Sequence, residues 1–107
     1  MIDIIKHPDS PDEIYGEDNI RALNIDKAWY WYETGCYEGN GTILMKKGNL
    51  WCIDDLGHCS CYGPTDKISF DGVTLDKLRT KHSEALCENA IKLLKLAKVY
   101  SKISNPA

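Results

Sequence analysis

The sequence has no long apolar run, and its longest apolar stretches fall far short of the roughly 20 residues that a membrane helix needs. The first residues, Met1 to Lys6, also lack the cationic start and the apolar run of a signal peptide. We therefore expect a cytoplasmic protein that does not contact a membrane.

The sequence also lacks the features of a disulfide framework, of a repeat protein and of a disordered chain. It has five cysteines, an odd number, without a secretory signal, which favours reduced thiols. No internal repeat or low-complexity tract is present. A length of 107 residues, with 43% hydrophobic and 27% charged residues, is typical of one globular domain, and we expect a single domain over residues 1–107.

A strong excess of charge is absent too, but the charges are unevenly distributed. The net charge is −3, and residues 1–40 hold nine acidic and three basic residues, whereas seven basic and two acidic residues follow from Lys77 onward. Such polarity fits a cationic face for an anionic partner, head-to-tail self-association, or merely solvated helix faces, which we favour. Nucleic-acid binding is disfavoured because no recognition motif accompanies the acidic balance.

Three segments have the pattern of strands that follow one another along the chain. Aromatic and β-branched residues favour a pleated sheet, and glycine with asparagine in Lys47–Asn49 predicts a compact hairpin turn. A second break, a turn or bulge, is predicted at Gly39–Gly41. The predicted strands are Lys27–Glu33, Thr42–Lys46 and Leu50–Asp54, with a short fourth strand at Lys67–Phe70.

The C-terminal part has helical periodicity. Thr74 is a predicted N-cap for a short helix over Leu75–Lys81, and Ser83 for a longer helix that ends before Asn105-Pro106. The fold class is therefore α+β: a three- or four-stranded antiparallel meander packed against a long C-terminal helix. An acidic segment over 1–26 precedes the sheet, which covers 27–70 and contains a loop at 56–64, and the helical segment covers 74–104.

Aromatic side chains occupy both faces of the first predicted strand. Side chains alternate along a strand, so Trp29 and Trp31 share one face while Tyr30 and Tyr32 share the other. One helix cannot cover both faces, and exposed rings would form an unusual apolar patch. Either the acidic N-terminal segment covers the second face, or a ligand or a partner subunit does.

The loop Leu56–Pro64 concentrates polar and thiol side chains between glycines. Constrained loops at a sheet edge are common places for binding residues. A zinc site could use His58, Cys59 and Cys61 with Cys36 or Cys52, although one residue between the paired cysteines is fewer than is usual. A cysteine nucleophile, Cys59 or Cys61, with His58 or His82 as base is a weaker hypothesis, because neighbouring side chains on an extended loop point apart.

Three segments carry a resemblance to a known family: the aromatic run Trp29–Glu33, the glycine-spaced segment Gly35–Gly41 and the loop Asp55–Pro64. Together they resemble a family of small uncharacterised proteins from phages and prophages. The His-Cys-Ser-Cys-Tyr-Gly-Pro run at 58–64 is the most specific part. The resemblance implies a phage setting inside a host cell and no mechanism. Small phage proteins of this kind often block a host defence protein or sequester a signal molecule.

Our sequence-based hypothesis is a non-enzymatic binding protein, with self-association left open. Its partner would be a host protein or a small molecule, and we expect no cofactor, with zinc as the alternative. Aromatic rings would supply stacking area, and polar loop groups would orient the ligand. The predicted binding residues are Tyr30, Tyr32, Glu33, Asn40, His58, Ser60 and Tyr62.

Overall fold

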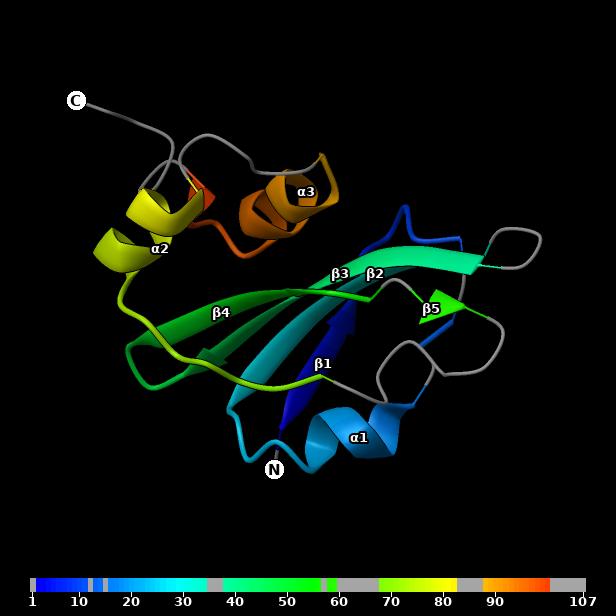
Figure 1. The fold of residues 1–107 in the computed structure, drawn as a ribbon, viewed down its shortest axis with the longest axis horizontal. Helices are drawn as coiled ribbons and strands as arrows, with labels where there is room; N and C mark the ends of the chain where they lie inside the picture. Colours follow the sequence, from blue (N-terminus) through cyan, green and yellow to red (C-terminus); the bar gives the residue numbers. More distant parts are fainter. Residues whose placement is uncertain are drawn as a thin grey trace.

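A computed structural model describes residues 2–11, 13–14, 16–34, 38–56, 58–59, 68–82 and 88–100. Its strands form one sheet, with α2 and α3 on one side and α1 on the other (Figure 1). Among these residues, no helix is long and apolar enough to cross a membrane. In chain order the elements are β1 (Asp3–Lys6), α1 (Glu17–Arg21), β2 (Lys27–Thr34), β3 (Glu38–Lys47), β4 (Leu50–Asp55), β5 (His58–Cys59), α2 (Leu75–His82) and α3 (Glu88–Leu96).

The predicted meander is confirmed for β2, β3 and β4, which pair antiparallel in sequence order. The prediction of a purely antiparallel sheet is wrong, however, because β1 pairs parallel to β2, with Asp3 opposite Lys27. Residues 7–26 separate the two strands, which is long enough for the chain to return to the same end of the sheet. The sheet order is β1-β2-β3-β4, and β5 adds a short pairing to β3.

Two further predictions are wrong, the break at 39–41 and the short strand expected to include 68–70. Residues 39–41 continue β3 without a break, because Gly41 lies directly opposite Tyr32 in the ladder. The described residues 68–70 are outside any strand, and an isolated bridge between Trp51 and Val73 follows them. The turn at Gly48 is confirmed, since its φ of 58° is the left-handed geometry that glycine tolerates.

The alternation predicted for β2 is confirmed, and each side of the sheet has its own core. We call the side that carries Tyr30 and Tyr32 the Tyr face, and the side that carries Trp29, Trp31 and Trp51 the Trp face. Helices α2 and α3 cover the Trp face through Leu78, Leu93 and Leu94. The N-terminal segment covers the Tyr face through Ile2, Ile20 and Ile25.

The long C-terminal helix predicted from the sequence is not found, because α3 has nine residues and ends at Leu96. Lys98 has a φ of 64°, and the amides of Lys98 and Val99 donate to the carbonyls of Lys95 and Leu94. This pair of hydrogen bonds is a Schellman motif, in which a residue of left-handed conformation ends the helix. The predicted helix start at Ser83 and the stop at Asn105-Pro106 lie outside the described residues.

Helix α2 agrees with its prediction. It covers Leu75–His82, and the backbone amide of Lys77 donates to the Thr74 hydroxyl at 3.4 Å. This is the N-cap contact expected for threonine, in which the side-chain oxygen satisfies a free amide of the first helical turn. The cap places the start of α2 beside the Trp face.

Candidate functional site

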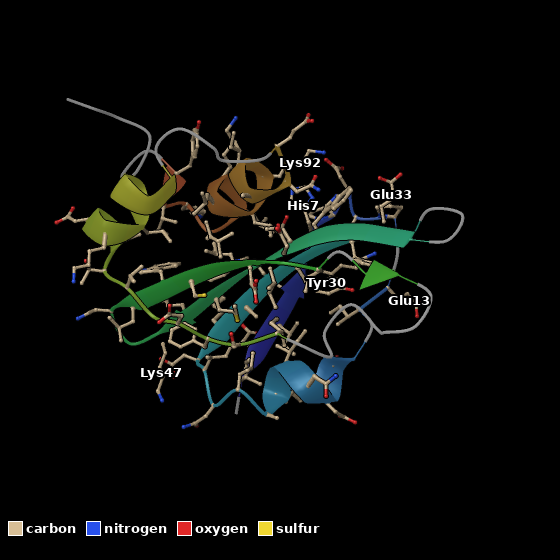
Figure 2. All side chains as sticks on the ribbon, in the orientation of Figure 1. His7, Glu13, Tyr30, Glu33, Lys47 and Lys92 are labelled. Carbon is tan, nitrogen blue, oxygen red and sulfur yellow. The ribbon has the colours of Figure 1, made fainter. Side chains whose placement is uncertain are left out.

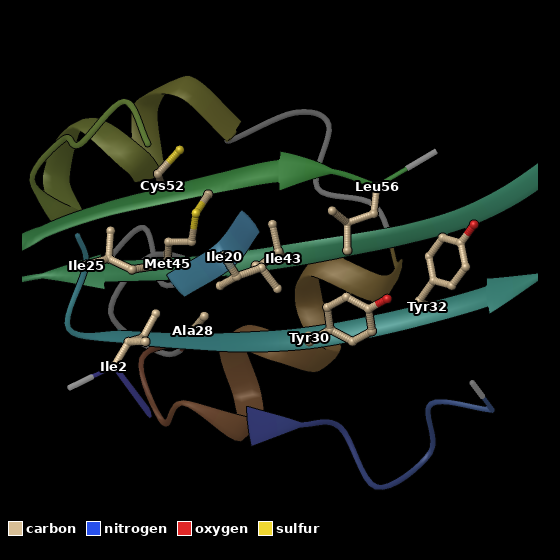
Figure 3. Close-up of a cluster of buried hydrophobic side chains, with 10 residues drawn as sticks. All are labelled: Ile2, Ile20, Ile25, Ala28, Tyr30, Tyr32, Ile43, Met45, Cys52 and Leu56. Carbon is tan, nitrogen blue, oxygen red and sulfur yellow. The ribbon is translucent and has the colours of Figure 1, made fainter. Parts of the chain in front are cut away.

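The two tyrosines predicted to line a binding surface are core residues. Tyr30 is 0% exposed and Tyr32 is 1% exposed, and their rings pack with Ile20, Ile43 and Leu56 on the Tyr face (Figure 3). The N-terminal segment encloses them, so the Tyr face needs no ligand or partner to keep its rings from water. The prediction that these rings form an open surface is therefore wrong, and of the two alternatives the covering N-terminal segment is confirmed.

The remaining predicted residues are only partly described. Glu33 is exposed and lies opposite Asn40 in the β2–β3 ladder, and His58 of β5 lies opposite Gly39. The backbones of these predicted residues thus meet at one end of the sheet. At Asn40 and His58 the description covers the backbone alone, and Ser60 and Tyr62 lie outside it, so their predicted role stays a prediction.

The zinc and cysteine-nucleophile hypotheses also fall mostly on residues outside the described part. In the described part, no group of three or more histidine, cysteine or acidic side chains is arranged to hold a metal. Cys52 is buried, and its thiol donates to the Ser69 carbonyl oxygen at 3.9 Å. Cys36 and Cys61 are not described, and Cys59 only in its backbone, so both hypotheses remain open.

A cleft of about 530 Å³ lies at the other end of the sheet, on the Trp face. Figure 2 shows Lys47, next to the β3–β4 hairpin, far from Glu33 along the sheet. The hairpin end of the sheet, the start of α2 and the chain after α3 enclose the cleft. We call it the Trp cleft, and its lining residues are Lys27, Trp29, Lys46, Asn49, Trp51, Thr74, Leu75, Ala97 and Val99.

Two stacked indoles form the floor of the Trp cleft. Trp29 of β2 and Trp51 of β4 have ring centroids 5.8 Å apart and planes inclined by 17°. They belong to strands on either side of β3 and lean together over it. They are 5% and 6% exposed, so packing holds both rings in place. The floor of the cleft is therefore rigid, and only a small part of each indole reaches it.

Two lysines flank this floor. Lys27 and Lys46 are directly opposite in the β2–β3 ladder, and alternation puts both on the Trp face. The Lys27 ammonium lies 5.3 Å from the centre of the Trp29 ring, and the Lys46 ammonium lies 5.5 Å from that of Trp51. These are cation–π distances. The charged groups that line the cleft are thus both positive.

The opposite wall of the cleft is held against the sheet by backbone hydrogen bonds. The amide of Trp51 donates to the Val73 carbonyl at 2.7 Å, and the amide of Val73 donates back at 2.8 Å. This bridge places Thr74 and Leu75, at the start of α2, at the rim of the cleft. Val99 follows the left-handed Lys98, so the helix end described above also shapes the wall.

The sequence contains a signal for this cleft that the alternation of aromatic residues alone does not reveal. Lys27 and Trp29 are two residues apart on a predicted strand, which puts them on one face. The predicted hairpin turn at 47–49 places Lys46 across from Leu50 or Trp51. Aromatic and cationic side chains alternating toward one face at a hairpin could therefore have been recognised, but not the helices that close the other side.

Comparison with known proteins found no family model, no curated protein and no solved structure that matches this chain.

Proposed function

We propose that the protein is a non-enzymatic binding protein that holds a small molecule in the Trp cleft. The observation that carries this proposal is a preformed cleft of about 530 Å³ with a stacked indole floor and two ammonium groups. Volumes of roughly 300–1,000 Å³ with aromatic linings and a few placed polar groups are usual for ligand sites.

The lining groups suit binding and orientation. Both indole rings are already fixed by packing, so a ligand that contacts them loses little conformational entropy there. Asn49 and Thr74 add an amide and a hydroxyl at the rim. Sequestration of a small signal molecule, which small phage proteins of the kind this chain resembles often perform, would need no more than such a site.

Native mass spectrometry of protein purified from cells under mild conditions tests the proposal. We expect the protein to carry a small molecule that denaturation releases. Ala97, which is partly buried at the cleft wall, provides a blocking variant, since Ala97→Phe would fill the cleft. Lys47→Gln is the matched control, because Lys47 is exposed and points to the other face of the same strand.

The expected result is retention by the wild type and by Lys47→Gln, and loss in Ala97→Phe at unchanged circular dichroism. Wild-type protein that carries no small molecule, and whose melting temperature does not respond to a metabolite library, would contradict the proposal. Equal retention by Ala97→Phe and the wild type would place the ligand elsewhere and contradict it as well.

A further inference from the structure

Lys27 and Lys46 form a like-charged pair inside the Trp cleft. Like charges directly opposite each other destabilise an antiparallel pair of strands. Asp3 lies 3.8 Å from the Lys27 ammonium, but the two side chains are 38% and 67% exposed, so solvent screens this ion pair. Among the described residues, Lys46 has no ion pair. Of the two lysines in the cleft, Lys27 therefore has one screened acidic partner, and Lys46 has none among the described residues.

The two ammonium groups lie against the indole rings and are not surrounded by solvent on all sides. Each lies within 5.5 Å of a ring centre, and Lys46 is only partly exposed. A charge held against apolar rings interacts more strongly with an opposite charge than one surrounded by water. An anionic group placed near these two lysines would relieve their repulsion.

The shape of the cleft defines the rest of the ligand. The indole planes are within 17° of parallel on one side, and Leu75, Ala97 and Val99 line the other. A flat ring inserted between these walls would contact the exposed part of the indoles on one side and these three side chains on the other. Aromatic rings gain from such contacts in both area and stacking geometry.

We infer that the Trp cleft binds a flat aromatic anion, with its ring against Trp29 and Trp51 and its carboxylate or phosphate between Lys27 and Lys46. This inference rests on the proposed function and names the chemical class of its ligand. A nucleotide and an aromatic carboxylic acid share this chemistry, and the experiment separates them.

Isothermal titration calorimetry on the full chain tests the inference with two matched pairs of probes. Adenosine monophosphate is compared with adenosine, and phenylacetate with its neutral amide, while inorganic phosphate reports on the charge alone. We expect at least one aromatic anion to bind about 10-fold or more tightly than both its neutral partner and phosphate. Its affinity should fall as salt is raised, because salt screens the lysines.

Three substitutions assign the effect to the cleft. Lys46→Gln should lower the affinity for the anion by about 10- to 100-fold, the usual effect of losing a charge-assisted hydrogen bond. Lys46→Arg should retain most of the affinity because it keeps the charge. Lys92→Gln is the matched control: the Lys92 ammonium lies 5.4 Å from the Trp31 ring, a similar cation–π contact outside the lining of the cleft. It should bind like the wild type.

The outcomes separate this inference from the proposed function. A neutral ring that binds as tightly as its anion, or Lys46→Gln and Lys92→Gln with the same affinity, would overturn the ligand class while the binding function stands. A molecule retained in native mass spectrometry that is not an aromatic anion would do the same. If no probe binds with a dissociation constant below about 1 mM and no molecule is retained, the proposed function fails too.

Discussion

Gly41 is a ladder position that leaves no room for a side chain. It pairs with Tyr32, and a Cβ atom there would collide with the Trp31 carbonyl oxygen and lie 2.7 Å from Cδ2 of the Tyr32 ring. The missing side chain lets the ring lie over the neighbouring strand. This close approach explains why β3 runs straight through a glycine-rich segment.

We expect Gly41→Ala to lower the free energy of unfolding by roughly 1–3 kcal/mol, because the methyl group overfills a packed site. Urea denaturation followed by circular dichroism measures the change. Gly48→Asn is the control, since a Cβ at Gly48 meets no atom within 4 Å and asparagine tolerates its positive φ. A Gly41→Ala protein as stable as Gly48→Asn would show that the ring does not lie there.

Lys98 has a side chain at a position where glycine would be more stable. Its φ of 64° lies in the left-handed region, where a Cβ atom costs about 1–2 kcal/mol. We expect Lys98→Gly to raise the free energy of unfolding by roughly 0.5–1 kcal/mol, after the entropy of glycine in the unfolded chain is deducted.

Lys95→Gly, in the last turn of α3, is the comparison for Lys98→Gly, and it should lower the stability by up to about 1 kcal/mol, because glycine is a poor helix former. Guanidinium denaturation of the two variants should therefore move the midpoint in opposite directions. A shift of both to lower denaturant would mean that α3 continues through Lys98 in solution.

At the scale of elements, the N-terminal segment is joined to β2 by more than the β1 strand. Beyond Lys6, the Ser10 hydroxyl donates to the Tyr32 carbonyl at 3.2 Å and accepts from the Tyr32 amide at 3.0 Å. Ser10 is buried, so this side chain takes the place of a further strand residue. It hydrogen-bonds both backbone groups of Tyr32 beyond the point where β1 ends.

Ser10→Ala should lower the free energy of unfolding by about 1–3 kcal/mol, because it leaves the amide and carbonyl of Tyr32 without this partner. Ser69→Ala, at an exposed position, should cost much less. Amide hydrogen exchange gives a local readout, in which the Tyr32 amide should lose protection in Ser10→Ala alone. An unchanged exchange rate there would contradict the contact.

For the whole molecule, the sheet couples two cores that lie on its opposite faces. Ile20 of α1 packs on the Tyr face, while all three tryptophans belong to the Trp face. Because the two cores share the same three strands, we expect them to unfold together, as small domains usually do.

Ile20→Ala should therefore lower the stability by about 2–5 kcal/mol and shift the transition seen by tryptophan fluorescence as much as that seen by circular dichroism. Fluorescence reports on the face that the substitution does not touch. A fluorescence midpoint that stays at the wild-type value, while circular dichroism shifts, would show that the Trp face folds independently.

Much of the sheet was determined by local sequence pattern. Alternating side chains placed Trp29 and Trp31 on one face of β2 and Tyr30 on the other, and the turn at Gly48 defined the β3–β4 hairpin. Thr74 capped α2 as predicted. These features depend on a strand period of two residues, on positive φ at glycine and on a local hydrogen bond, which short sequence segments encode by themselves.

The tertiary structure alone decided which aromatic face is enclosed and where a cleft remains. Strand β1 pairs in parallel with β2, and Ile2, Ile20 and Ile25 cover the Tyr face, whereas α3 ends at Leu96 and the residues after it line the Trp cleft. Both outcomes depend on contacts between segments far apart in the chain. Local periodicity does not encode such contacts, because they arise only when whole elements compete to cover the same apolar surface.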